Sequence, residues 1–108
     1  MSAAVVRRWE ATVDRKDIDD WVKMYRARVL PGMHDIDGFE GVSFLARREE
    51  DPCHVIALTK WRDMEAITAF AGDNPSNTVL PDFMARFFQT YDAEATFYDE
   101  VLQENADE

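Results

Sequence analysis

The chain has 108 residues, of which 46% are apolar and 12% aromatic, and this composition predicts a folded domain with its own core. A formal net charge of −10 argues against binding to nucleic acid or to an anionic membrane surface, because both need a basic face. Cys53 is the single cysteine, and no apolar run reaches membrane-spanning length, so we expect a cytoplasmic protein. One domain is expected over residues 1–103, with an acidic tail over 104–108.

The first predicted element is a strand over residues 4–13, in which side chains alternate between two faces. Arg7 shares a mostly apolar face with Trp9. A buried charge is usually paired, so the simpler interpretation is that Arg7 forms an ion pair with a carboxylate. The alternative is that Arg7 holds an anionic or oxygen-bearing group of a ligand.

A helix is predicted next, beginning at Asp14 or Asp17, where an aspartate oxygen can cap the first turn. Pro31 and Gly32 are expected to end or kink this helix, although one further short turn is also compatible. His34 lies in that break, where a lone histidine is more typical of a surface group than of a metal ligand. Apolar side chains recur at helical spacing along one face: Ile18, Trp21, Val22, Tyr25, Val29 and Met33.

Two strands over residues 39–48 and 53–61 flank the polar turn 49–52 and predict a hairpin. Cys53 and His54 are neighbours in the second strand and therefore point to opposite faces. That geometry argues against a catalytic Cys–His pair.

A second helix follows directly, because Asp63 can cap its start and Gly72 can occupy the positive-φ position after its end. We expect the apolar stripe of this helix to pack on the sheet. The stripe consists of Met64, Ile67 and Phe70.

The last third of the chain begins with a turn-rich stretch, residues 73–77, and then a helix that starts at Pro81. A closing strand is predicted over residues 95–102. The expected helix carries aromatic side chains that form either core or the wall of an apolar pocket: Phe83, Phe87, Phe88 and Tyr91.

This βαββαβ order predicts an α+β, ferredoxin-like sandwich, with one antiparallel sheet and helices on one face. The predicted strands carry apolar groups on both faces, yet the helices can cover only one of them. We therefore expect a homodimer that buries the other sheet face.

Three segments resemble the antibiotic biosynthesis monooxygenase-like family of the dimeric α/β-barrel superfamily: RRWEATV, VLPGMHDIDGFEGVSFLARR and LTKWRDMEAITAFAG. The third is similar to the family's T-x-W-x-S-x-E-A signature, with Asp63 in place of the serine. The ending YDAEATFYDEV is also similar, with Phe97 where relatives often have histidine. The resemblance spans the domain and implies a dimeric α/β barrel.

The family includes cofactor-independent oxygenases, which convert phenolic or anthrone-type aromatics into quinones, and haem-degrading enzymes. The tryptophan and histidine of the haem degraders align with Phe70 and the vicinity of Leu80, so the resemblance does not imply haem degradation. Trp61 matches a tryptophan of the oxygenases, but Ala57 replaces their asparagine. Ala57 and Phe97 favour a non-catalytic dimeric module that binds a small ligand or a protein.

The other interpretation is a cofactor-independent monooxygenase that acts on a small hydrophobic aromatic. Such an enzyme needs no metal, flavin or haem, since the substrate supplies the electron to dioxygen while the protein promotes loss of its proton and excludes water. The candidate catalytic residues are Trp61, Arg7 and His34. Trp61 either lines a pocket between sheet and helices, with Arg7 or His34 nearby, or only fills the core, and the core position is the simpler interpretation. The candidate substrate-binding residues, each of which is equally compatible with a core position, are Trp9, Trp21, Tyr25, Phe88 and Tyr91.

Overall fold

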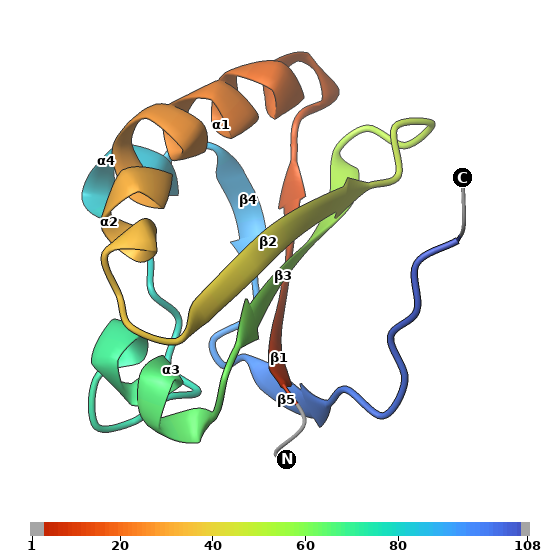
Figure 1. Cartoon of the computed structure of the whole chain (residues 1–108). Coiled ribbons are helices and arrows are strands. Elements are labelled where there is room, and N and C mark those ends of the chain that lie inside the picture. The colour runs from red at the N-terminus through yellow and green to blue at the C-terminus, as the bar shows by residue number, and fades with distance from the viewer. Residues whose placement is uncertain (1–3, 107–108) are drawn as a thin grey trace.

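The computed structural model describes residues 4–106. These residues form a five-stranded antiparallel sheet with all the described helices on one face (Figure 1). Its order is β2-β3-β1-β4, and β5 also pairs with β1. The strands are β1 Val5–Val13, β2 Phe39–Ala46, β3 Cys53–Trp61, β4 Phe88–Tyr91 and β5 Thr96–Asp99. The helices are α1 Ile18–Met24, α2 Leu30–His34, α3 Met64–Ala71 and α4 Asp82–Ala85. The predicted ferredoxin-like fold is confirmed, and no described helix is long and apolar enough to cross a membrane.

The centre of the sheet is the pair β1 and β3, in which Arg7 lies opposite Thr59 and Val5 lies opposite Trp61. Every second residue of β1 is buried, beginning at Val5. These side chains face the helices because neighbouring residues in a strand point to opposite faces. The pairing therefore directs Arg7 and Thr59 into the layer between sheet and helices.

The break expected at Pro31 and Gly32 is absent, and the helical path continues from α1 to His34. A π-helical turn, Tyr25–Val29, connects α1 to α2, and the Leu30 amide donates to the carbonyl of Tyr25. Proline lacks an amide hydrogen and crowds the carbonyl four residues before it, so a widened turn accommodates Pro31 where a regular helix would not. The π-helical turn thus lies directly before the proline that it accommodates.

The helix expected from Pro81 to Tyr91 is also wrong in extent. Its helical part ends at Ala85, and Phe88–Tyr91 pairs with β1 as strand β4. The closing strand is likewise shorter than predicted, because β5 covers only Thr96–Asp99. The edge of β1 offers unpaired backbone groups, and pairing with them satisfies the amides and carbonyls of this aromatic segment.

Helix α3 agrees with its predicted boundaries. The Asp63 carboxylate accepts a hydrogen bond from the Ala66 amide at 3.0 Å, and Gly72 follows the helix with φ of 86°. The buried face of α3 differs slightly from the expected stripe, since Ala66 and Ile67 are buried while Met64 is 39% exposed. The helix therefore lies on the sheet through small side chains and one isoleucine.

Two clusters of buried side chains form the core on the helix side of the sheet. One is centred on Trp21, Val13 and Val55, and the other on Trp61 and Ile67. Tyr25 and Val29 pack against both clusters. The opposite face of the sheet is covered by no described helix, and it carries apolar side chains: Val6, Leu45, Ile56, Leu58 and Tyr98.

Gly38 lies directly before β2 and against Ala66 of α3, and we expect Gly38→Ala to lower the free energy of unfolding by about 2 to 4 kcal/mol. Its φ is +95°, and an added Cβ would lie 2.6 Å from the Cβ of Ala66. Gly32→Ala is the matched control, because Gly32 is helical with no atom near an added Cβ, so the change is stabilising by less than about 1 kcal/mol. Urea unfolding measures both. Equal stabilities for the two variants would contradict this packing.

Candidate functional site

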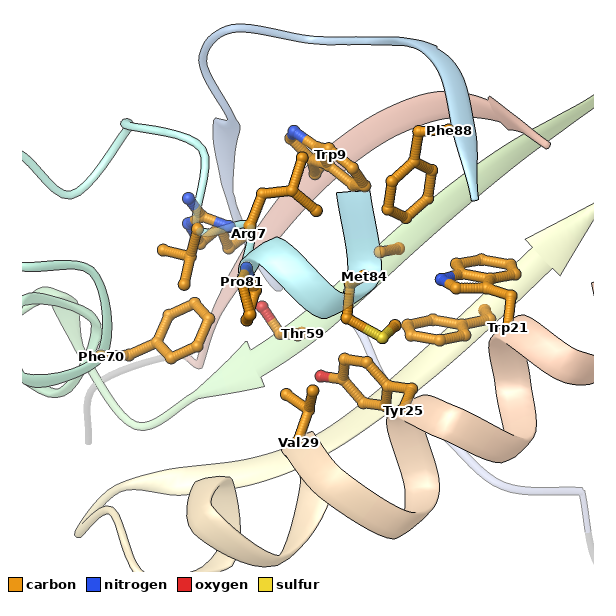
Figure 2. Close-up of a pocket in the computed structure, with 14 residues that line it drawn as sticks. Arg7, Trp9, Trp21, Tyr25, Val29, Thr59, Phe70, Pro81, Met84 and Phe88 are labelled. Carbon is orange, nitrogen blue, oxygen red and sulfur yellow. The ribbon is translucent and has the colours of Figure 1, made fainter. Parts of the chain in front are cut away.

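A cavity of about 80 Å³ lies between the sheet and the helices, where the two core clusters meet. Figure 2 shows its lining side chains. They come from strands β1, β2, β3 and β4, from α1 and the π-helical turn that follows it, from α3, and from α4 with the residues just before it. The wall is mostly apolar. The lining residues are Arg7, Trp9, Trp21, Tyr25, Val29, Phe44, Ala57, Thr59, Phe70, Val79, Leu80, Pro81, Met84 and Phe88.

Aromatic rings pack closely along one side of the cavity. The rings of Trp21 and Phe44 stack with 4.4 Å between centroids and an interplanar angle of 2°. Trp9 meets Phe88 edge to face at 5.0 Å, and Tyr25 meets Phe44 at 4.5 Å. Packing of this kind holds flat apolar surfaces in place. The cavity therefore offers flat, preformed surfaces to an apolar ring.

Arg7 is the only charged residue in the described lining, and it is 5% exposed. Its Nε and Nη2 donate to the carbonyls of Pro75 and Asn77 at 3.2 and 2.6 Å. Its guanidinium carbon lies 5.4 Å from the ring centroid of Phe70. The expected ion pair is therefore replaced by two carbonyls, which accept hydrogen bonds from Nε and Nη2 without cancelling the charge of Arg7.

Tyr25 brings a hydroxyl to the same cavity, and that hydroxyl donates to the sulfur of Met33. Burial raises the pKa of Tyr25 to about 12, while the nearby charge of Arg7 acts in the opposite direction. Burial disfavours the charged form of Arg7 as well and therefore lowers the pKa of Arg7, but arginine in a protein keeps its proton nonetheless. At neutral pH the tyrosine is a hydrogen-bond donor and not a phenolate base.

The structure places Trp61 in the core instead of the cavity wall. Its side chain is 0% exposed and packs against Phe39 and Phe70, with ring centroids 5.2 Å away in both cases. Its indole N–H donates to the hydroxyl of Thr59 at 2.8 Å. Thr59 and Phe70 line the cavity, so Trp61 contacts the site through these two neighbours and does not line it.

His34 and Tyr91 also lie away from the cavity. His34 is exposed at the end of α2, where its ring contacts Phe39 with 5.5 Å between centroids. Tyr91 is 50% exposed on β4 and contacts Trp9 from outside the lining. The structure therefore brings together Arg7 and the other predicted binding residues, Trp9, Trp21, Tyr25 and Phe88.

Thr59 and Phe44 are lining residues that the sequence analysis did not single out. A signal for Thr59 was present, because it lies in a strand two residues before Trp61 and therefore on the same face. Phe44 lies in the strand predicted over residues 39–48, where strand alternation gives the face of a side chain and not its neighbours. Neither pattern separates a cavity wall from core.

The described residues contain no cluster of three or more histidine, cysteine, aspartate or glutamate side chains that is placed to hold a metal ion. Among the described lining residues there is also no histidine, lysine or carboxylate. The polar side-chain groups that remain are a guanidinium, two hydroxyls and the indole N–H groups of Trp9 and Trp21. The arrangement presents aromatic surfaces and can donate hydrogen bonds to oxygen atoms of a ligand.

Solved structures from several bacteria share this arrangement of strands and helices. A monooxygenase from the gene ActVA-Orf6 of Streptomyces coelicolor, in complex with Nanaomycin D, is 14% identical with a TM-score of 0.68, covering 98% of this chain and 94% of that one. A proposed antibiotic biosynthesis monooxygenase from Bacillus cereus is 13% identical with a TM-score of 0.67, covering 98% and 99%. This chain has the fold of the antibiotic biosynthesis monooxygenases.

SnoaB, a cofactor-independent oxygenase from Streptomyces nogalater, is similar at 16% identity with a TM-score of 0.61, covering 94% of this chain and 97% of that one. The sequence matches no protein-family model and no curated protein. The resemblance noted from the sequence is therefore confirmed at the level of the fold. Identities this low indicate a shared architecture and do not indicate a shared reaction.

Tyr25 should make the stability of the protein depend on alkaline pH. Its folded-state pKa is raised from 10.0 to about 12, so the folded state binds the proton more tightly than the unfolded state. The contribution is complete below pH 10 and is lost between pH 10 and 12, which amounts to roughly 2 to 3 kcal/mol of unfolding free energy. Urea unfolding across this range measures the decrease.

Tyr25→Phe removes this part of the pH dependence, while Tyr98→Phe, a change on the opposite sheet face, keeps it. Tyrosinate absorbance provides a second readout, because the difference between wild type and Tyr25→Phe should titrate near pH 12. A midpoint close to pH 10 would show that the Tyr25 hydroxyl is not buried as described.

Proposed function

We propose that this protein is a cofactor-independent monooxygenase that acts on a small hydrophobic aromatic of the phenol type. The observation that carries the proposal is the aromatic-walled cavity with the guanidinium of Arg7 inside it. The fold shared with ActVA-Orf6 and SnoaB supports the same class of reaction. A buried apolar site with few polar groups is also the general form of a small-molecule site.

The reaction balances without a cofactor. A phenol and dioxygen give a quinone and water: the substrate anion supplies electrons to dioxygen, a carbon–oxygen bond forms, and water leaves. The rings of Trp21 and Phe44 would orient the substrate, and Arg7 would hold its oxygen. The apolar wall would keep water from the oxygenated intermediate.

The size of the cavity bears on the substrate. An engineered apolar cavity of about 150 Å³ accepts benzene, whereas this cavity is about 80 Å³. A one-ring ligand therefore needs the wall to move outward. Val79, Leu80 and Pro81 form part of that wall and belong to no helix or strand, so they are the segment that can yield at low cost.

A second candidate is a binding module without catalysis. The observation that favours it is the absence of a histidine or carboxylate from the described lining, together with the position of His34 outside it. In that case the cavity would bind an aromatic and leave it unchanged. Oxygen uptake separates the two candidates.

We expect oxygen uptake when the purified protein is mixed with phenols, naphthols or anthrones, and a quinone product by absorbance and mass. Ala57→Leu should lower the rate about tenfold or more, because Ala57 lines the cavity and the larger side chain fills it. Ala69→Leu, an equal change on the exposed side of α3, should leave the rate unchanged. The oxygenase proposal would be contradicted by an absence of oxygen uptake with all of these substrates, or by equal oxygen uptake in both variants.

The same proposal includes a homodimer that buries the sheet face away from the helices. Leu45 and Tyr98 on this face are 49% and 53% exposed, and Ile56 and Leu58 lie between them. An antiparallel sheet normally presents polar side chains on a face that meets water. A second copy offers the same apolar face by symmetry.

Sedimentation at micromolar concentration should show a dimer for the wild type. Leu58→Lys should give a monomer, because the new charge would be buried at the centre of the interface. Met64→Lys is the matched control, since Met64 is an exposed apolar residue on the helix side and its replacement should keep the dimer. A monomeric wild type, or a dimer that survives Leu58→Lys, would contradict this interface.

A further inference from the structure

The polar groups of the cavity share one property, which is that all of them are available as hydrogen-bond donors. Arginine has donors only. The Tyr25 hydroxyl retains its proton far above neutral pH. The Thr59 hydroxyl already accepts from the indole of Trp61, which leaves its own hydrogen to donate. Such a lining matches a ligand with acceptor oxygens and offers little to a ligand that donates.

Arg7 adds a positive charge that no described side chain cancels. In residues 4–106 no carboxylate forms an ion pair with it, and its partners are the carbonyls of Pro75 and Asn77. A cation removed from water without a counter-ion is costly, and an anion placed beside it would repay part of that cost. Occupation of the cavity by an anion would supply the missing charge.

The third nitrogen of Arg7 is free to meet such an anion. Nε and Nη2 have carbonyl partners, whereas Nη1 makes no hydrogen bond within the described chain. No buried side-chain nitrogen or oxygen among the described residues lacks a partner, so Nη1 must be accessible, and Arg7 lines the cavity. Figure 2 shows Arg7 with Thr59 and Tyr25 around the space that Phe70 and Pro81 help to enclose.

A base is missing from the same lining. His34, the histidine among the candidate catalytic residues, lies outside the cavity, and no carboxylate is among the described lining residues. A phenol bound there has no protein group within the described lining to take its proton. The proton must therefore pass to water, and the cavity must favour the form of the ligand that has already lost it.

We infer that the cavity selects the oxyanion of its aromatic ligand, a phenolate or enolate, whose charge is neutralised by Arg7 and whose oxygen accepts hydrogen bonds from Thr59 and Tyr25. This inference rests on the proposed function for the kind of ligand, but not for any turnover. The protein would then activate its substrate by making the bound ligand more acidic, without a catalytic base. Trp61 then acts as a positioning residue, because its indole orients the Thr59 hydroxyl.

The test uses 4-nitrophenol, whose phenolate form is coloured, in a pH titration of the bound probe. The wild-type protein should lower the pKa of the probe by about one unit or more, which corresponds to phenolate binding about tenfold more tightly than phenol. The neutral ether 4-nitroanisole should bind more weakly than the phenolate. A bound-probe pKa that is unchanged or raised would overturn the inference without any variant.

Variants assign the effect to particular groups. Arg7→Gln should abolish the pKa shift, while Arg48→Gln, which removes an exposed arginine from a distant loop, should keep it. Thr59→Val should reduce the shift, and it should weaken binding of the 4-nitrophenolate more than binding of 4-nitroanisole. Thermal melting checks that each variant is folded. If Arg7→Gln does not fold, the wild-type titration and Thr59→Val still test the inference.

Failure of this inference is distinguishable from failure of the proposed function. Phenolate selection without oxygen uptake would keep the anion site and reject the oxygenase. Oxygen uptake without phenolate selection would keep the oxygenase and reject the anion site. Equal affinity for phenolate and ether in both wild type and Arg7→Gln would show that Arg7 only anchors the loop of Pro75 and Asn77.

Discussion

The antiparallel pairing of β1 with β3 determines both the centre of the sheet and the chemistry beneath the helices. It places Arg7 opposite Thr59 and Val5 opposite Trp61, all on the face that the helices cover. A shift of one residue in this register would turn Arg7 toward the open face and bury Arg8 in its place. The buried guanidinium, its loop of carbonyl partners and the cavity all depend on that register.

Arg7 also connects the sheet to the longest irregular connection in the described chain. By donating to Pro75 and Asn77 it holds the stretch after α3 against β1. That stretch leads into Val79, Leu80 and Pro81, which close the cavity. One side chain therefore contributes to folding, to the cavity wall and to the electrostatics of the site, and a substitution there affects all three.

The two hydroxyls of the cavity are held in different ways. The Thr59 oxygen accepts from Trp61, a fully buried residue, so the second core cluster orients a group in the cavity. Within residues 4–106, the Tyr25 hydroxyl has only the sulfur of Met33 as partner, which is a weak acceptor that a ligand oxygen can replace. The cavity thus combines one fixed donor with one that can turn toward a ligand.

Local patterns predicted the elements whose signals lie within a few residues. The cap at Asp63 and the glycine at position 72 mark the two ends of α3, and strand patterns mark β1 and β3. Hydrogen bonds and steric limits of neighbouring residues decide these features. The same reasoning misassigned Phe88–Tyr91 as helix, since its strand conformation depends on pairing with the distant edge of β1. For Trp61 the sequence left both a cavity position and a core position open for a similar reason: strand alternation indicates its face but not its neighbours.

By itself the sequence determined the order of the elements as far as α4, the apolar face of β1 and the aromatic character of the layer above the sheet. Only the tertiary structure decided that Arg7 meets carbonyls and no carboxylate of residues 4–106, that Thr59 lines the cavity with Trp61 behind it, and that His34 lies outside. The physical reason is range. Alternation, capping and helical spacing act over one or two turns, whereas a cavity arises where side chains from strands and helices far apart in sequence fail to fill the space between them.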